Sequence, residues 1–135
     1  MRALRILVAE DDAMIGSLLA DLLSGMGHTC KIAGTEAGAI IDAIRYGPDL
    51  MIVDAQLGDG SGIAAVDAIL SAGPMPHLFV SGDARRVLAL RPDALVLQKP
   101  FREADLVRAI QQAVVDLLAP CAGAETRVPP ETTAR

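Results

Sequence analysis

Acidic residues at two places in this chain could together hold a divalent cation. Glu10 and Asp11 follow one short apolar segment, and Asp54 follows another. Two like charges about 4 Å apart repel by roughly 4 kcal/mol at an effective dielectric of about 20, so neighbouring carboxylates that all stay ionised need a cation. Oxygen ligands with an open side suit Mg²⁺, which keeps several waters and accepts phosphate oxygens. These residue types therefore predict a magnesium site.

A hydroxyl and an ammonium group follow two further apolar segments. Lys99 could hold a transferring phosphoryl group from the side opposite the carboxylates, and Ser81 could donate a hydrogen bond to a phosphoryl oxygen. A metal ion, a lysine and a hydroxyl provide the charge stabilisation that phosphoryl transfer requires, and a carboxylate such as Asp54 can be the nucleophile. These residues therefore predict phosphoryl transfer to Asp54.

The elements that must position these residues alternate between strands and helices. Apolar segments of strand length occupy residues 4–9, 28–33, 50–53, 77–80 and 94–97. Helical spacing, capping residues and glycine stops predict helices after Asp11 or Asp12, after Thr35, near 63–70, at 84–90 and at 103–118. This order favours an α/β fold, a doubly wound (βα)₅ sheet of five parallel strands in the order 2-1-3-4-5, with helices on both faces.

The carboxyl ends of the strands in such a sheet lie along one edge, where ligands bind. Glu10 and Asp11 follow the first strand, Asp54 the third, Ser81 the fourth and Lys99 the fifth. Because the first and third strands are neighbours in the predicted order, the three carboxylates should converge. We therefore expect all five side chains at one site.

The composition limits the classes of function. The chain has 135 residues, 52% hydrophobic and 21% charged, which fits one compact domain. A net charge of −5 and 2% aromatic residues disfavour direct binding of nucleic acid. No apolar run approaches the about 20 residues that span a bilayer, and no signal peptide is visible, so we expect a cytoplasmic protein without membrane insertion. The isolated Cys30 and Cys121 are expected to be free thiols, and His28 and His77 to be structural or solvent-facing.

Four segments resemble the signatures of bacterial two-component response-regulator receiver domains. In chain order they are Ile6–Asp12, Pro48–Gly62, Phe79–Ser81 and Lys99–Phe101. The resemblance implies a flavodoxin-like, CheY-like fold over residues 1–118. Residues 119–135 are rich in proline, threonine and charge, which predicts a flexible C-terminal tail.

The resemblance also assigns roles to the acidic residues. Asp54 would accept the phosphoryl group. Glu10, Asp11 and Asp54 would surround Mg²⁺, with Asp11 as a direct ligand and Glu10 acting through water. Gln56 would contribute its backbone carbonyl to the metal.

On the opposite side of the site, the resemblance gives Ser81 and Lys99 contact with the phosphoryl group. The peptide bond between Lys99 and Pro100 would be cis. In receiver domains, the positions of Gln56 and Asp83 tune how fast the acyl phosphate is hydrolysed. The site would therefore control both formation and lifetime of the phosphorylated form.

The function implied by the resemblance is signalling and not metabolic catalysis. Asp54 would take the phosphoryl group from a sensor histidine kinase or a histidine phosphotransfer protein, and the chain would catalyse only its own phosphorylation and dephosphorylation. Because few residues follow Leu118, we expect no output domain. We therefore expect a stand-alone receiver, a monomer or weak homodimer, that binds another protein, passes the phosphate on or competes for a kinase's phosphate.

Four features depart from the usual receiver pattern. Val96 stands where an aromatic residue usually couples phosphorylation to output. The short stretch from Ser81 to Lys99 predicts a shortened or absent fourth helix. Gly82 stands where alanine is common, and Gly58 where proline is frequent. The segments around Ser81 and Lys99 resemble an alphaproteobacterial group of stand-alone receivers that lack the aromatic switch.

Other interpretations of the same residues remain open from the sequence. Singly, Asp11, Asp12 and Asp54 could be helix caps or turn residues. A phosphatase with an aspartyl-phosphate intermediate would place its nucleophile after the first strand, and a phosphate-independent binding domain could keep the pocket as a relic. The segment Gly58–Gly62 lacks the spacing of a nucleotide-binding loop, and Ala65 stands where an EF-hand needs glutamate.

The apolar residues at the start of the first helix have two expected roles. Met14, Ile15 and Leu18 should pack mainly in the core. By analogy with the family, their exposed edge, together with Pro100 and Phe101, would dock the helical bundle of a kinase. This edge is therefore the predicted partner surface.

Overall fold

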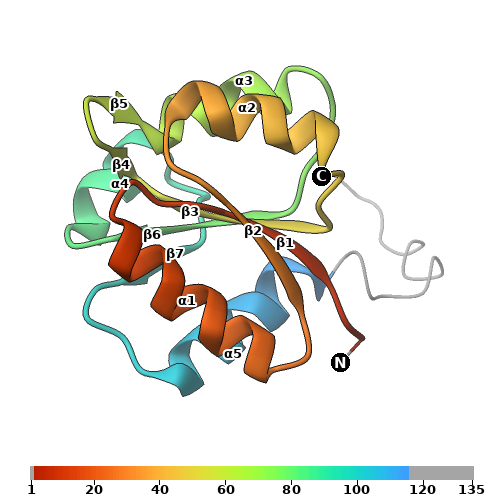
Figure 1. The fold of residues 1–135 in the computed structure, drawn as a ribbon. Coiled ribbons are helices and arrows are strands. Elements are labelled where there is room, and N and C mark those ends of the chain that lie inside the picture. Colours follow the sequence, from red (N-terminus) through yellow and green to blue (C-terminus); the bar gives the residue numbers. More distant parts are fainter. Residues whose placement is uncertain (1, 116–135) are drawn as a thin grey trace, which may run out of the picture.

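The computed structural model describes residues 2–115 as a parallel sheet between two layers of helices (Figure 1). The strands of the sheet are β1 (Arg5–Ala9), β2 (Thr29–Ala33), β3 (Leu50–Asp54), β6 (His77–Ser81) and β7 (Val96–Gln98). They pair in parallel in the order β2-β1-β3-β6-β7, which confirms the predicted order 2-1-3-4-5. A separate small hairpin consists of β4 (Gln56–Leu57) and β5 (Gly60–Ser61).

Helices cover both faces of the sheet, as predicted. They are α1 (Ala13–Gly25), α2 (Glu36–Arg45), α3 (Gly62–Leu70), α4 (Ala84–Leu90) and α5 (Glu103–Ala113). Figure 1 shows α1 and α5 on one face and α2 and α3 on the other. The fourth helix has only 7 residues, which confirms that it is short, and within residues 2–115 no helix is long and apolar enough to cross a bilayer. The predicted helix end at 118, the predicted tail at 119–135 and Cys121 lie outside the described residues.

Side-chain caps and glycine turns set the boundaries of the helices. Asp12 caps α1, Thr35 caps α2 and Ser61 caps α3, each with a side-chain oxygen that accepts hydrogen bonds from backbone N–H groups of the first turn. Gly27 and Gly47 follow α1 and α2 with φ angles of 96° and 64°, a conformation that glycine adopts without strain. The sequence predicted helix starts after Asp11 or Asp12 and after Thr35, with glycine stops, but it did not identify Ser61 as a cap.

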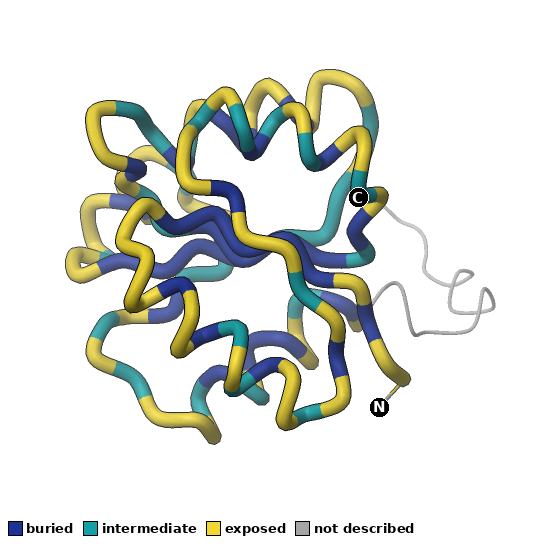
Figure 2. Tube along the Cα trace, in the orientation of Figure 1, coloured by how far each residue is buried: buried dark blue, intermediate teal, exposed yellow. Residues whose placement is uncertain are grey.

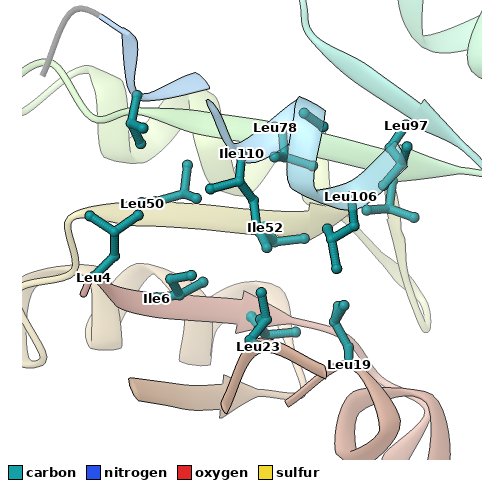
Figure 3. Packing of buried hydrophobic residues seen from close by; sticks show 14 residues of the cluster. Leu4, Ile6, Leu19, Leu23, Leu50, Ile52, Leu78, Leu97, Leu106 and Ile110 are labelled. Carbon is teal, nitrogen blue, oxygen red and sulfur yellow. The ribbon is translucent and has the colours of Figure 1, made fainter. Parts of the chain in front are cut away.

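The strands alternate their side chains between two apolar layers. Ile6 and Val8 of β1 pack with α1 and α5, whereas Leu7 and Ala9 pack with α2 and α3. Figure 3 shows the first layer, with leucines of α1 and α5 against the strands. In the central strand β3, residues 50–53 are all buried, as expected for a strand covered on both faces. Figure 2 shows the central strands buried and the outer sides of the helices exposed, whereas the edge strand β2 is largely exposed.

The exposed side of α1 corrects one prediction. Met14 and Leu18 are 73% and 59% exposed, and Ile15 is also exposed, although the sequence placed all three mainly in the core. Leu19 and Leu23 pack against the sheet instead. Apolar residues occupy several sides of this helix, so their spacing alone does not determine which side faces the sheet.

Two further segments differ from the sequence-based expectation. The segment 56–61, for which the sequence predicted neither a strand nor a helix, is the β4–β5 hairpin, and Gly58 in its turn has a φ of 57°. Because proline cannot adopt a positive φ, the proline that is frequent at this position in receivers does not fit this turn. The last strand begins at Val96 and not at Ala94, because the N–H of Ala94 donates to the Arg91 carbonyl in a turn after α4.

Candidate functional site

Three carboxylates meet where β1 and β3 end. Glu10 and Asp11 directly follow β1, and Asp54 is the last residue of β3, the strand next to it. One carboxylate oxygen from each of the three lies within 4.8 Å of the others. The structure thus brings together the three acidic side chains that the sequence predicted to converge.

Glu10 is the buried member of this acidic cluster. Its side chain is 6% exposed, and Oε2 accepts a hydrogen bond of 3.2 Å from the Asp12 N–H. Burial is the main cause that raises the pKa of Glu10 to about 7; the Asp12 hydrogen bond opposes this shift and the charge of Asp54 adds to it. Three carboxylate oxygens that repel one another are a donor set that fits a hard divalent cation such as Mg²⁺.

Lys99 lies beside this cluster. It follows β7, and its Nζ is 2.8 Å from Asp54 Oδ2 and 3.8 Å from Glu10 Oε1. Burial alone would lower the pKa of Lys99, but the hydrogen bond and charge attraction of Asp54 outweigh it, so the pKa is raised above its ordinary value. The lysine is therefore an ammonium group at neutral pH. The peptide bond from Lys99 to Pro100 is cis, as predicted.

Ser81 and Gln56 lie at a cleft on another side of Asp54. The cleft has a volume of about 550 Å³, and its lining also includes Asp83 and Arg86. Ser81 is buried, and its Oγ accepts a hydrogen bond of 2.9 Å from the Asp83 N–H, which leaves its own O–H available as a donor. The backbone N–H of Gln56 donates to Asp54 Oδ1 at 2.9 Å. Both residues therefore line the same cleft as Asp54.

An apolar cavity adjoins the same carboxylate on the α1 side. Its volume is about 210 Å³, and its lining includes Ile15, Leu18 and Phe101 together with Asp54 and Lys99. The exposed apolar side of α1 therefore continues into the site. Asp54 stands between this cavity and the polar cleft.

Two residues that shape the site were not predicted from the sequence. A Cβ atom at Gly62 would overlap the Asp54 carbonyl oxygen and lie 2.7 Å from Val53 Cγ1, so only glycine lets α3 start this close to the acidic cluster. The glycine-rich segment after Asp54 was the available signal. The second residue is Gln98, whose side chain hydrogen-bonds to the segment between β6 and α4. No sequence pattern indicated this contact.

The histidines and Cys30 lie outside this cluster. Nδ1 of His28 accepts a hydrogen bond of 3.0 Å from the Leu4 N–H, and Nδ1 of His77 is 2.8 Å from the Met75 carbonyl. Both histidines contact backbone groups, which agrees with the expectation that they are structural or solvent-facing. Cys30 is a free thiol.

Comparison with known families gives one match that covers the site. The family model of the response regulator receiver domain matches residues 6–111. Among curated proteins, "Transcriptional regulatory protein PdtaR" of Mycobacterium tuberculosis is 36% identical over 118 residues, which are 82% of this chain and 56% of that protein. The chain thus spans about half the length of this relative.

Solved structures give the same result. The receiver (REC) domain of the PhyR response regulator from Erythrobacter litoralis is 33% identical, with a TM-score of 0.78 over 87% of this chain and 95% of that one. The response regulator PhyR from Brucella abortus is 27% identical, with a TM-score of 0.81 over 93% of this chain and 53% of that one. The whole described fold therefore has counterparts in known receivers.

Proposed function

Because the chain belongs to the response regulator receiver family, we propose that Asp54 takes a phosphoryl group from a phosphohistidine of a partner protein. Receiver domains act in two-component signalling and are not metabolic enzymes. The observation that carries the proposal is the 2.8 Å hydrogen bond from Lys99 Nζ to Asp54 Oδ2, beside the carboxylates of Glu10 and Asp11. It supports the proposal because a nucleophilic carboxylate needs a neighbouring cation when phosphoryl oxygens approach.

In the proposed transfer, a carboxylate oxygen of Asp54 bonds to phosphorus while the bond between phosphorus and the partner's imidazole nitrogen breaks. The nitrogen keeps the bonding electron pair and is reprotonated. Asp54 is held for attack by Lys99 at Oδ2 and by the Gln56 N–H at Oδ1. Lys99 and the Ser81 hydroxyl would then bind the phosphoryl oxygens. The chain would catalyse only this reaction and the later hydrolysis of its own acyl phosphate.

The acidic cluster would hold the Mg²⁺ that receiver domains generally bind. Its ligands would come from Glu10, Asp11 and Asp54, with the backbone carbonyl of Gln56. When bound, the ion would offset negative charge on the carboxylates and on the phosphoryl oxygens. The repulsion among three carboxylates supports this assignment, because it makes the cluster unfavourable without a cation.

The partner would dock on the exposed apolar residues of α1. Met14 and Leu18 are largely exposed, and Leu18 also lines the cavity that contains Phe101 and Asp54. An apolar surface beside the acceptor suits a helix that must bring its phosphohistidine to Asp54. We assign this surface to a sensor histidine kinase or a histidine phosphotransfer protein.

Incubation with acetyl phosphate and Mg²⁺, followed by intact mass measurement, tests the proposal. The wild-type chain should gain one phosphoryl group, and Asp54→Asn should gain none. Asp59→Asn, which changes an exposed aspartate of the nearby hairpin, is the matched control and should be labelled normally. An unlabelled wild-type chain, or full labelling of Asp54→Asn, would contradict the proposal.

A further inference from the structure

The side chain of Gln98 joins β7 to the segment that connects β6 with α4. Its Nε2 donates to the Gly82 carbonyl at 2.7 Å and to the Lys99 carbonyl at 3.0 Å, and its Oε1 accepts from the Ala84 N–H at 2.8 Å. An amide has two N–H donors and one carbonyl acceptor, so both donors and the acceptor of this side chain are used. Gln98 is exposed, which means that burial alone does not hold it in this position.

The contact with Ala84 matters because it lies at the start of α4. The first N–H groups of a helix have no partner within the helix, and Ala84 is the first residue of this one. The side chain of Asp83 caps the N–H of Arg86, whereas Gln98 caps that of Ala84 from the neighbouring strand. A helix of 7 residues has little stability of its own, so these caps fix where it begins.

The same segment carries the hydroxyl of the site. Ser81 is at its start, and the Ser81 Oγ accepts a hydrogen bond from the Asp83 N–H. The Lys99 N–H donates to the Ser81 carbonyl at 2.8 Å, so Gln98 reinforces a backbone contact beside it. Its amide therefore links the segment that holds Ser81 to the strand end that delivers Lys99.

Given the proposed function, we propose that Gln98 is a positioning residue for phosphoryl transfer. It holds the Ser81 hydroxyl and the Lys99 ammonium at a fixed separation on either side of Asp54, without touching the phosphoryl group itself. The other side chains of β7 are Val96 and Leu97, which cannot hydrogen-bond to the segment. Without the amide, the segment that contains Gly82 would be free to move, because glycine restricts the backbone least.

Two substitutions at Gln98 and one control test this role. Gln98→Met keeps the length of the side chain but removes all three hydrogen bonds. Gln98→Glu keeps the acceptor for Ala84 and removes both donors. Gln112→Met is the matched control, because Gln112 is exposed on α5 and its side chain makes no hydrogen bond to the described residues. The measurements are the rate of phosphate uptake from acetyl phosphate at saturating Mg²⁺, the exchange of the Ala84 amide hydrogen by NMR, and the melting temperature.

The expected pattern separates positioning from folding. Gln98→Met should take up phosphate about tenfold to a hundredfold more slowly than the control, since small misplacements have effects of this size. It should also exchange the Ala84 amide hydrogen faster, while its melting temperature stays close to that of the control. Gln98→Glu should protect the Ala84 amide like the wild type yet still take up phosphate more slowly. A residue that served only the fold would change the melting temperature and leave the uptake rate of the folded chain unchanged.

Each contrary outcome has a separate meaning. If the wild type is labelled and both Gln98 variants take up phosphate at the control rate, the positioning role is wrong and the proposed function stands. If Gln98→Glu alone keeps the wild-type rate, capping of α4 is sufficient and the link to Lys99 is wrong. If the wild-type chain takes up no phosphate, the proposed function fails, and the positioning role fails with it.

Discussion

At the amino ends of the strands, polar side chains pair with the backbone, whereas at the carboxyl ends charged side chains face one another. His28 accepts a hydrogen bond from the Leu4 N–H, and Asp49 accepts one of 2.9 Å from the Arg5 N–H. At the other end, three carboxylates and one lysine lie together, and burial raises the pKa of Glu10 to about 7. One end satisfies its polar groups, and the other concentrates like charge.

This difference indicates how the two ends contribute to the protein. Like charges held together oppose folding and favour a ligand that neutralises them. A buried polar group that is paired with the backbone instead supports the fold, because losing its partner leaves an unsatisfied group. Changes to charged side chains at the carboxyl ends should therefore affect phosphate uptake more than stability, and changes at the amino ends should do the reverse.

The largest effect is expected from Lys99→Met. It removes the ammonium group beside Asp54, so uptake from acetyl phosphate should fall about 100-fold to 1,000-fold, as when a preorganised charge-stabilising donor is lost. Lys31→Met is the matched control, since Lys31 pairs at the surface with Asp42, and it should leave the rate unchanged. Equal rates for the two variants would mean that the charges at the carboxyl ends do not perform the chemistry.

Gly62→Ala tests how tightly the backbone packs at the carboxyl ends of the strands, where α3 starts beside Asp54. The new methyl group would collide with the Asp54 carbonyl, so the free energy of unfolding in urea should fall by about 1–3 kcal/mol. Gly25→Ala, at the end of α1, meets no atom within 4 Å. It should raise stability by about 0.5–1 kcal/mol, since alanine loses less entropy in a helix. A neutral Gly62→Ala would contradict the close approach of α3.

Leu18→Lys extends the comparison to the surface beside the site. It should slow phosphate transfer from a phosphorylated histidine partner by about tenfold, the effect of losing roughly 1.4 kcal/mol at a docking contact. Uptake from acetyl phosphate should not change, because a small donor needs no docking surface. Ile44→Lys is the control: Ile44 is 76% exposed but lies on α2, on the opposite face of the sheet. If both variants transfer equally well, the partner binds elsewhere.

The smallest effect is expected at the amino ends, from the titration of His28. Burial lowers its pKa, and its Nδ1 must be unprotonated to accept the Leu4 N–H. The unfolded chain therefore binds more protons than the folded one, and stability is lost as the pH falls below about 6.5, the ordinary histidine value. His28→Gln keeps an acceptor that does not titrate, so on going from pH 7 to pH 5 the variant should gain stability relative to the wild type in urea unfolding. The comparison is made against the wild type because Glu10, with a pKa of about 7, titrates in the same range in both proteins. An unchanged pH slope would show that His28 is not the group responsible.

The sequence was sufficient to predict the position of a site residue where that residue directly follows a strand. Strand identity was readable from short apolar runs, and the parallel order then required Glu10, Asp11 and Asp54 to meet at one edge. The position of Lys99 followed from the same argument. The structure brings these four side chains together.

The sequence was insufficient to predict contacts that depend on helix packing or on the path of a connecting segment. Apolar residues occupy several sides of α1, so the sequence did not determine which side of the helix faces the sheet. Met14 and Leu18 were therefore wrongly assigned to the core. The Gln98 amide contacts Gly82 and Ala84, which lie 16 and 14 residues earlier, across a turn whose path no local pattern specifies. Such contacts become visible only when the whole chain is folded.

Asp54 lines both the apolar cavity beside α1 and the polar cleft beside α4. A phosphate donor bound at α1 would therefore leave the second opening uncovered. Under the proposed function, a protein that recognises the modified aspartate through the cleft could join before the donor departs, in a ternary complex. The residence time of the donor would then not limit how quickly the signal is passed on.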